Sequence, residues 1–563
     1  MPTLDSSDLA NSDALPERLR CDICIVGTGP AGMTIARELS NTRVRVTVLE
    51  SGRMDRQEEA DALNEIENVG WPRVMEQWLV RNRIVGGSSH TWTGRCAPFD
   101  DIDFQARSWV PHSGWPFGIS DLMPYINRTG RYLGLGSGNG ITDDRIWELT
   151  KRPKPSLGSK ADQMPEDSDK LLPMFWQFSR ERANQYDRVR FRRLAAELGN
   201  NVTIVTNATA LRVNPTDSAN AVESVDFAAL GGRRWTLPTP TIILCAGGIE
   251  NARLLLSSDN AKSQGLGNKN GIVGRFLMDH PRGTVARFPM KKTQAVLSQY
   301  AVFKSNTPGA NLYQRGMRLS PAVQRSEELL NCAAWIDERL APDDPWDALI
   351  RFMRREPDAR PDFRAMAMNG GLLIRGLKEH FISHAVLPRK LAQVTLEVMT
   401  EQLPNPNSRI TLSDRRDNLG TRIPRIDWRV SEAEARSMRR ITELVVDHLT
   451  LMGIESPDIE EWVRDGKMFP RTIVDIAHPS GTTRMADNPT KGVVDAHCQV
   501  HGVAGLYIGG SSVFPTAGHA NPTQMIVALA LRLADTLKER HCSTTGSSEK
   551  SMAGTRDSER PEA

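Results

Sequence analysis

The feature that most restricts the fold is a glycine-rich turn near the start of the chain. Residues 27–32 read Gly-Thr-Gly-Pro-Ala-Gly, the spacing G-x-G-x-x-G. The turn follows a strand-like run, Ile23–Val26, and precedes helical periodicity over Met33–Leu39 and a second strand-like run over Val44–Glu50. This order predicts a β-α-β unit whose helix N-terminus binds a pyrophosphate, because free N–H groups and the helix dipole favour anions there.

Each glycine of this phosphate cradle has a physical task. Gly27 allows the tight turn, Gly29 lets the backbone approach a pyrophosphate, and Gly32 lets the helix pack closely on the strand. Glu50 stands 18 residues after Gly32, where a ribose hydroxyl needs an acceptor. The alternative for Glu50 is a solvated strand end. The cradle predicts dinucleotide binding and does not distinguish NAD from FAD.

Composition excludes several other classes of protein. The 563 residues suffice for two intertwined domains, and 39% apolar with 25% charged residues is ordinary globular composition. With 71 basic against 68 acidic residues and no basic block, a nucleic-acid footprint is unsupported. The apolar stretches are too short for a membrane span, and the first residues lack the pattern of a secretory signal. We therefore expect a cytoplasmic protein.

The seven cysteines do not form a disulfide framework. Cys21 and Cys24 form a C-x-x-C, which raises a redox or metal interpretation. Both lie in a strand-like run and no second pair follows at zinc spacing, so a structural role is favoured.

Two further strand–glycine junctions occur far along the chain. Thr241–Ala246 ends at a Gly-Gly pair and opens a helix through Leu256, and Gly505–Ile508 ends at another Gly-Gly pair. Together with the cradle, they predict one sheet assembled from discontinuous segments. A closing helix is expected from Pro522 to Lys538.

Residues 281–490 have a different character and predict a second domain that caps the first. They contain proline-rich loops, amphipathic helical patterns over Trp346–Arg355 and Ser431–Met452, and an alternating strand pattern over Arg409–Ser413.

A second glycine-rich loop, residues 83–94, contains hydroxyl side chains and a tryptophan. Such a loop suits a flavin, because the isoalloxazine edge needs backbone donors and the ring needs a flat neighbour.

At these motifs the sequence resembles the glucose–methanol–choline (GMC) oxidoreductase family. The resemblance runs from about residue 20 to 540 and rests on the ordered combination of residues 27–32, 86–89, 245–250, 478–485, 509–516 and 521–523. Residues 279–281 and 401–406 also resemble the branch of pyranose oxidases and bacterial relatives that act on sugars and glycosides.

The resemblance implies an α/β fold, α+β overall. A Rossmann-like FAD-binding domain with a mixed sheet would be assembled from discontinuous segments, beside a substrate domain built on a large antiparallel sheet covered by helices. The chain then divides into a flexible leader (1–19), FAD-binding parts (20–145, 200–280 and 491–540), a surface loop and substrate-domain segment (146–199), a substrate-binding domain (281–490) and a disordered tail (541–563).

Carried over position by position, the resemblance also implies the cofactor contacts. The ADP half would be held by Gly27, Gly29, Pro30, Ala31, Gly32 and Glu50, with the backbone of Ala210 at the adenine. The pyrophosphate and flavin would be surrounded by Gly87, Ser88, Thr91, Trp92, Ala246, Gly510, Ser511, Asn521 and Thr523.

One departure concerns the flavin linkage. Where pyranose and choline oxidases carry a histidine bonded to the flavin, this chain has Thr91, and His90 comes one residue earlier. Along an extended loop, neighbouring side chains point in opposite directions. We therefore expect non-covalent FAD.

His478 is the predicted catalytic base and Asn521 its partner, since the family places a His and an Asn at these motifs beside the flavin N5. An alcohol that loses hydride from carbon must also lose its hydroxyl proton, and a histidine with a pKa near ~6.5 can accept it. Asparagine cannot take a proton, but its N–H can donate to the substrate oxygen. The structural alternative is a His-Pro turn and an Asn that caps the last helix.

The sequence thus predicts an FAD-dependent alcohol oxidoreductase that oxidises a hydroxyl group of a sugar or glycoside, with oxygen or a quinone-like carrier as electron acceptor. The alternatives are a family member acting on a non-sugar alcohol, an NAD-dependent dehydrogenase using the same cradle, and a non-catalytic flavin-binding protein. A hydrolase has little support, as no G-x-S-x-G occurs. The oligomeric state stays open.

The remaining polar candidates are weaker. His380 with His384 and His497 with His501 have the helical i,i+4 spacing of zinc ligands, but no third ligand follows, so no metal is expected. His519 either lines the site or packs a loop. Glu397 and Glu401 reach the substrate from the second domain or lie at the surface.

Overall fold

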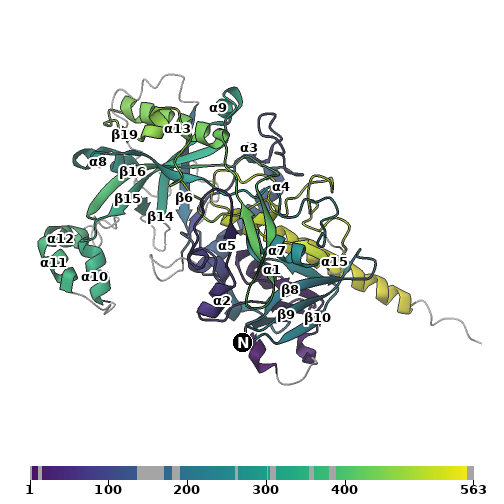
Figure 1. Cartoon of the computed structure of the whole chain (residues 1–563). Coiled ribbons are helices and arrows are strands. Elements are labelled where there is room, and N and C mark those ends of the chain that lie inside the picture. Colours follow the sequence, from purple (N-terminus) through teal and green to yellow (C-terminus); the bar gives the residue numbers. More distant parts are fainter. Residues whose placement is uncertain are drawn as a thin grey trace, which may run out of the picture.

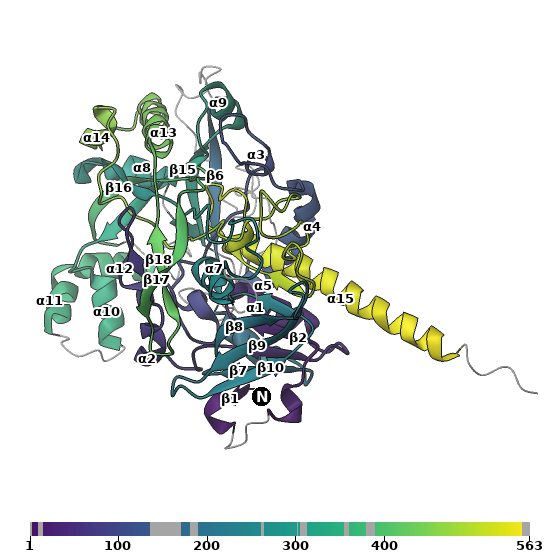
Figure 2. The ribbon, with the colours of Figure 1, turned by 45° about the vertical axis from the view of Figure 1, so that its right-hand side comes forward.

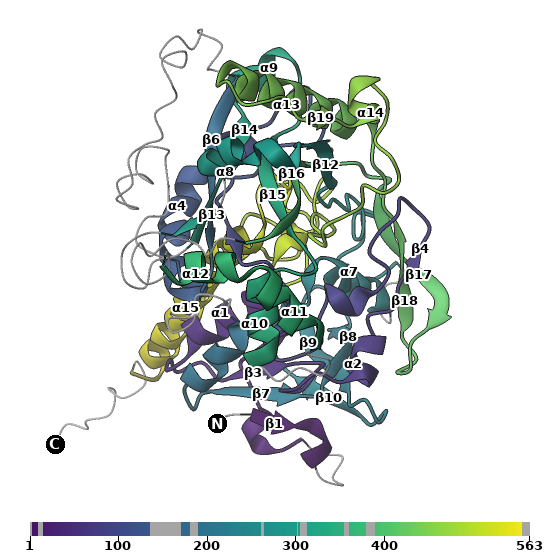
Figure 3. The same cartoon turned by 90° about the vertical axis from the view of Figure 1, so that its left-hand side faces the viewer.

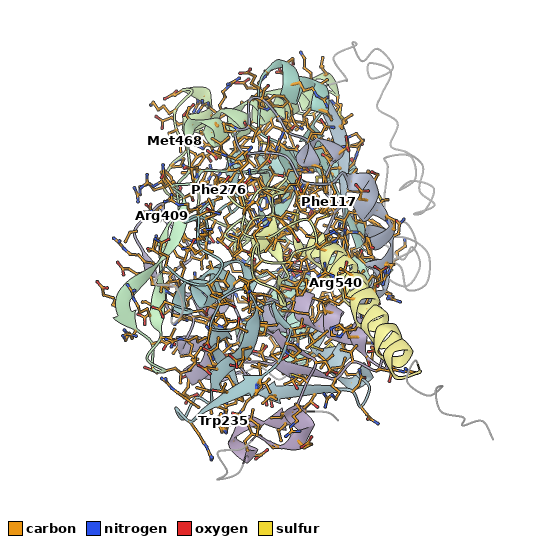
Figure 4. All side chains as sticks on the ribbon, turned by 90° about the vertical axis from the view of Figure 1, so that its right-hand side faces the viewer. Phe117, Trp235, Phe276, Arg409, Met468 and Arg540 are labelled. Atoms are coloured by element: carbon orange, nitrogen blue, oxygen red, sulfur yellow. The ribbon has the colours of Figure 1, made fainter. Side chains whose placement is uncertain are left out.

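A computed structural model describes residues 3–9, 15–135, 170–180, 190–259, 264–300, 302–304, 312–353, 360–378 and 389–553. A parallel sheet and a large antiparallel sheet lie at opposite ends of the molecule (Figure 1). Figure 4 marks the two ends by Trp235 and Met468, with Phe276 between them. None of the helices in the described ranges combines the length and apolar character needed to cross a bilayer.

The parallel sheet has six strands in the order β1-β7-β3-β2-β11-β20, and every neighbouring pair is parallel. Its strands are β1 (Thr3–Asp5), β7 (Val202–Thr206), β3 (Val46–Leu49), β2 (Ile23–Val26), β11 (Ile242–Leu244) and β20 (Leu506–Ile508). The central strands are buried throughout, which explains why they read as continuous apolar runs. The predicted sheet of discontinuous segments is confirmed.

Three helices follow the strand–glycine junctions or close the chain. They are α1 (Pro30–Leu39), α7 (Gly247–Ser257) and α15 (Thr523–Ala553). Figure 2 shows α15 crossing beside α1 and then projecting from the body.

The structure corrects three expectations at this end of the molecule. The implied mixed sheet is parallel, because its antiparallel neighbours form a separate sheet of β8 (Thr209–Pro215), β9 (Val222–Ala228) and β10 (Arg234–Pro238). The leader is not loose over residues 3–9, since β1 pairs with the open edge of β7. The predicted tail is helical up to Ala553, since extending an existing helix costs little.

The antiparallel sheet has the order β19-β12-β16-β15-β14-β6-β5, and β13 pairs with β14. Its strands are β19 (Asp458–Ile459), β12 (Arg282–Arg287), β16 (Leu391–Thr400), β15 (Cys332–Leu340), β14 (Leu312–Leu319), β13 (Val302–Lys304), β6 (Leu171–Phe178) and β5 (Arg95–Cys96). Helices α13 (Glu432–Leu451) and α8 (Thr293–Tyr300) cover it and share its hydrophobic core. The start of α13 is the predicted one, with Ser431 and Glu434 forming a capping box.

Each end of the molecule contains segments from the part of the sequence that mainly forms the other end. Strands β5 and β6 enter the antiparallel sheet from ranges before residue 281, and the hairpin β17 (Arg409–Arg416)–β18 (Arg422–Asp427) packs on α7 beside β4 (Glu67–Asn68). Of the predicted surface loop and substrate-domain segment, residues 146–199, the structure describes 170–180 and 190–199, and Leu171–Phe178 form β6. Residues 146–169 lie outside the described residues.

Between β15 and β16 the chain forms a three-helix lobe of α10 (Pro345–Met353), α11 (Arg360–Met368) and α12 (Gly370–Lys378). Figures 1 and 3 show this lobe standing away from the antiparallel sheet. Among the described residues, the other α-helices are α2 (Glu58–Ala62), α3 (Asp101–Phe104), α4 (Ile119–Arg128), α5 (Gly130–Leu133), α9 (Pro321–Ser326) and α14 (Glu461–Arg464).

Candidate active site

A cavity of about 470 Å³ lies between the carboxyl ends of the parallel strands and the antiparallel sheet. The antiparallel sheet and its flanks contribute Arg95, Trp176, Arg282, Trp335 and Met399 to its wall. The cavity brings together the predicted residues Gly27, Gly29, Pro30, Ala31, Glu50, Gly87, Ser88, Thr91, Trp92, Ala210, Ala246, His478, Gly510, Ser511, Asn521 and Thr523. Gly32 does not line it.

The cradle has the predicted steric logic. Gly27 has φ of 101°, a conformation that favours glycine. A Cβ on Gly32 would lie 1.9 Å from the Gly27 carbonyl oxygen, so only glycine allows this packing of helix on strand. A Cβ on Gly29 would meet no protein atom within 4 Å. The backbone at Gly29, the N-cap of α1, therefore faces open space where a pyrophosphate fits.

Glu50 is buried, so it is not a solvated strand end. Its Oε2 accepts hydrogen bonds from the backbone N–H of Thr28 at 3.0 Å and from the Thr28 hydroxyl, and its Oε1 accepts from the N–H of Gly52 at 2.9 Å. Burial raises the pKa of Glu50 against the opposing effect of these bonds. Glu50 thus also holds the cradle turn in place, which the sequence motif did not indicate.

The flavin-side loop differs from the expected extended conformation, because residues Gly87–His90 form a 3-10 turn, η4. The His90 Nε2 lies 2.9 Å from the carbonyl oxygen of Val85, to which it donates, and His90 does not line the cavity. Thr91 lines the cavity, and its hydroxyl donates to the Asn82 side chain at 2.8 Å. The side chains of His90 and Thr91 therefore lie apart because of this turn, and not because side chains alternate along an extended strand.

The loop that carries His478 is held by a buried ion-pair network. Arg73 contacts Asp279 at 2.8 Å and Asp475 at 2.9 Å, and all three side chains are at most 1% exposed. The backbone N–H of His478 donates to Asp279 Oδ1 at 2.9 Å. Ala477 has φ of 60°, a strained conformation for a residue with a Cβ, and its N–H donates to Asp475 at 3.1 Å.

The His478 imidazole lies between two polar groups. Its Nε2 is 3.5 Å from Asn521 Nδ2, and its Nδ1 is 3.0 Å from the Nδ1 of His280. His280 is buried and its Nε2 lies 2.9 Å from the Gly518 carbonyl oxygen. Burial, with a smaller contribution from His280, lowers the pKa of His478 to about 3. His478 is therefore neutral at ordinary pH.

Sequence reasoning missed His280, Asp279 and Arg73 as parts of this site. Their one signal in the sequence is the Asp-His-Pro of residues 279–281, which resembles the branch that acts on sugars and glycosides but does not indicate a role in the site.

Ser511 and Asn521 line the cavity, and each also contacts the segment that carries His478. The Ser511 hydroxyl donates to the Pro479 carbonyl at 2.8 Å, so this side chain supports the His478 loop. Helix α15 begins at Thr523, after Asn521, and the Asn521 amide faces His478.

The two weaker acidic candidates, Glu397 and Glu401, lie in different environments. Glu401 forms a fully buried bidentate pair with Arg107 at 2.6 and 2.8 Å, which is a structural role. Glu397 binds Arg282 at 3.2 Å, and Arg282 is the member of this pair that lines the cavity.

His519 is buried, and it does not line the cavity but lies 3.6 Å from Asp100 and 3.8 Å from Asp103. This group is the cluster of potential metal ligands found in the described part of the chain. Arg318 already binds Asp100 at 2.7 Å and Asn331 donates to Asp103 at 2.9 Å, so protein groups engage both carboxylates.

The other histidine pairs and the C-x-x-C take no part in the site. His497 and His501 lie in turns and not on a helix, and His501 Nε2 lies 2.8 Å from the Ala486 carbonyl. His380 and His384 lie outside the described residues. Cys21 and Cys24 are buried free thiols whose pKa values are raised by burial, as a structural role requires.

Comparisons with known proteins show which family the chain resembles. The model of the C-terminal domain of GMC oxidoreductases matches residues 404–530, and that of an NAD(P)-binding Rossmann-like domain matches residues 25–54. Paromamine 6'-oxidase of Streptomyces fradiae is 24% identical over 91% of this chain and 90% of its own. Residues 404–530 thus resemble the C-terminal domain of GMC oxidoreductases, and most of the chain is similar to this relative.

Other comparisons agree with this resemblance. The fructose dehydrogenase large subunit of Gluconobacter japonicus is 21% identical over 92% of this chain and 98% of its own. Among solved structures, formate oxidase of Aspergillus oryzae is 18% identical, with a TM-score of 0.56 over 93% of this chain and 99% of its own, which shows the shared fold. The family model and these relatives indicate an FAD-dependent enzyme that acts on CH–OH groups. The Rossmann match covers only the cradle, which NAD and FAD enzymes share.

Proposed function

We propose that this protein oxidises a hydroxyl group of a sugar or glycoside to a carbonyl, with His478 as the base and Asn521 as its partner. The observation that carries the proposal is the position of the His478–Asn521 pair, in the same cavity as the phosphate cradle. The names of paromamine 6'-oxidase and the fructose dehydrogenase large subunit support a sugar-like substrate.

The residues divide the chemistry between them. The neutral His478 takes the proton of the substrate hydroxyl at a ring nitrogen, which removes the barrier that a weakly acidic alcohol presents. The Asn521 amide donates to the substrate oxygen as negative charge develops there. FAD, when bound by the cradle and the residue 86–91 loop, supplies the hydride acceptor.

The facing wall suits a polyhydroxylated ring. Arg95 and Arg282 line it and hold their guanidinium groups over the ring of Trp335, with 5.1 and 4.9 Å between the guanidinium carbon and the ring centroid. Guanidinium N–H groups are hydrogen-bond donors that suit the hydroxyl groups at the edge of a sugar ring.

The test is an anaerobic flavin-reduction screen of the purified holoenzyme against sugars, glycosides and simple aliphatic alcohols. We expect saccharides to bleach the flavin with the highest kcat/KM, and a far higher kcat/KM for aliphatic alcohols would refute the sugar proposal. A protein bleached by no alcohol would favour a non-catalytic flavin-binding role. In parallel, His478→Ala that binds FAD should reduce it far more slowly, and a rate within about tenfold of wild type would remove His478 as the base.

Reoxidation is assigned by the same sample. We propose oxygen or a quinone-like carrier as the acceptor, and exposing the reduced enzyme to air and then to a soluble quinone identifies which one restores the flavin absorbance.

We also propose that FAD is bound without a covalent link, since Thr91 lines the cavity and the His90 ring is engaged with the Val85 carbonyl. Acid precipitation should leave the flavin in the supernatant. Flavin that stays with the polypeptide would contradict this, and loss of the link in His90→Ala would then identify the attachment.

A further inference from the structure

We infer that His280 is a positioning residue that fixes the tautomer of His478, leaving the lone pair of the base on Nε2. The inference rests on the proposed function and concerns a residue that touches neither substrate nor cofactor.

The tautomer follows from which groups can donate. The Gly518 carbonyl oxygen can only accept a hydrogen bond, so the His280 Nε2 at 2.9 Å carries a proton and donates it. A neutral His280 then has no proton on Nδ1, and this atom accepts at 3.0 Å from the Nδ1–H of His478. A neutral His478 therefore has its lone pair on Nε2.

The neighbouring groups agree with this assignment. The Nε2 of His478 is the atom that faces the Asn521 amide N–H, a donor, at 3.5 Å. Burial lowers the pKa of both His280 and His478, which keeps both rings neutral. In the opposite tautomer, a proton on Nε2 would face the Asn521 amide, and the two Nδ1 lone pairs would repel each other at 3.0 Å.

The consequence is a base that is preorganised in protonation as well as in position. When His478 takes the substrate proton at Nε2, its Nδ1–H can keep its hydrogen bond to His280, so no ring needs to turn. The carboxylate of Asp279, which accepts the backbone N–H groups of both histidines at 2.9 Å, lies near the positive charge that forms.

Two substitutions separate the tautomer role from packing. In His280→Asn, the side-chain oxygen can occupy the Nδ1 position and accept from His478, but the Gly518 contact is lost. In His280→Gln, the amide N–H can reach the Nε2 position and keep the Gly518 contact, but nothing accepts from His478. The measurement is the limiting rate of flavin reduction and the substrate Kd, by anaerobic rapid mixing of FAD-loaded proteins.

We expect His280→Asn to stay within about threefold of wild type. His280→Gln should lose on the order of 10- to 100-fold in the limiting rate with little change in Kd, a part of the roughly 10²–10⁴-fold that a general base contributes. Equal losses in both variants, or a slower Asn variant, would show a packing role and overturn the inference. His478→Ala is measured in the same way. If it reduces its flavin rapidly, the proposed base is wrong. If it is slow but His280→Asn and His280→Gln have equal rates, only the tautomer inference fails.

A second observation concerns the apolar lobe, the helices α10–α12 between residues 345 and 378. We propose that the lobe docks on an anionic lipid surface. Its outward side chains are 43–74% exposed and large: Phe352, Met353, Phe363, Met368, Ile374 and Leu377. Exposed apolar side chains gathered on adjacent short helices mark an interaction surface, and Figure 3 shows these helices on the outside of the molecule.

The charges on the lobe select the partner. Residues 345–378 contain seven basic and four acidic residues, and three of the exposed apolar residues are each followed by an exposed cation, Arg364, Arg375 or Lys378. Apolar residues interleaved with basic ones are typical of helices that lie in a membrane interface. A symmetric contact with a second copy would instead bring this basic face against the same basic face of the copy.

The test is co-sedimentation of the holoenzyme with phosphatidylcholine vesicles, with and without phosphatidylglycerol. We expect binding to the anionic vesicles only, reduced at least about tenfold by Met353→Glu with Ile374→Glu. Met290→Glu, at an exposed methionine outside the lobe, should bind as wild type does. Absence of binding to anionic vesicles would refute the proposal, as would a dimer in sedimentation velocity that the double variant dissociates, which would assign the face to a second copy.

Discussion

The two ends of the cavity are built in opposite ways. The dinucleotide end is formed by backbone from short contiguous motifs, and what matters there is the absence of side chains, as at Gly27, Gly29 and Gly32. The His478 end is formed by side chains from segments about 200 to 400 residues apart, joined through Arg73 and Asp279. An added side-chain atom should therefore disrupt the dinucleotide end, and the loss of an interacting side chain should disrupt the His478 end.

The largest expected effect is at the dinucleotide end. Gly32→Val should abolish recovery of FAD-loaded protein, because its Cβ would lie 1.9 Å from the Gly27 carbonyl oxygen and cannot be accommodated. Gly29→Ala is the matched control: its Cβ meets no protein atom within 4 Å, so the protein should fold but hold FAD more weakly. Flavin absorbance per chain and the Tm distinguish the two. A Gly32→Val protein with full FAD content would show that close packing is not what the cradle needs.

At the catalytic end, Arg73→Leu should cost about 3–5 kcal/mol of unfolding free energy, because two buried carboxylates lose their cation. Urea unfolding of the holoenzyme measures the loss. Adding Asp475→Asn should restore part of the stability, since one uncompensated charge is removed. If the double variant is no more stable than Arg73→Leu, charge compensation is not the source of the effect.

Asn521→Ala should affect the chemistry more than the fold. Losing one donor to the developing charge is worth about 2–4 kcal/mol, which corresponds to a rate of flavin reduction roughly 30- to 1,000-fold lower. Rapid mixing with the FAD-loaded variant measures it. An Asn521→Ala rate within about threefold of wild type would leave Asn521 with only a structural place beside α15.

The smallest effect concerns pH. Because the pKa of His478 is about 3 in the folded protein, the base should stay neutral and kcat/KM for flavin reduction should lack an acid limb near the ordinary histidine pKa of ~6.5. Between these values the unfolded chain binds a proton that the folded protein does not, so stability should fall as pH drops below ~6.5, by at most about 1.4 kcal/mol per pH unit from this group. His478→Ala should flatten that dependence, and an acid limb near ~6.5 in the wild type that His478→Ala lacks would contradict the buried neutral base.

The sequence by itself determined the features that depend on neighbouring residues. The cradle, the central strands and the capped start of α13 follow from local sterics, apolar periodicity and hydrogen bonds within a few residues. The other motifs that line the cavity followed from the resemblance to the GMC oxidoreductase family.

Only the tertiary structure decided which distant side chains meet. His280 reaches His478 across 198 positions and Arg73 reaches Asp475 across 402, and no spacing rule connects such residues. The positions of β5, β6 and β1 along the chain likewise did not predict which sheet each strand joins. An edge strand pairs with whichever sheet edge the folded core leaves open. The tautomer of His478 depends on the carbonyl of Gly518, because His280 links the two groups by hydrogen bonds. These bonds form only when packing brings the Gly518 carbonyl within 2.9 Å of one His280 nitrogen and His478 within 3.0 Å of the other.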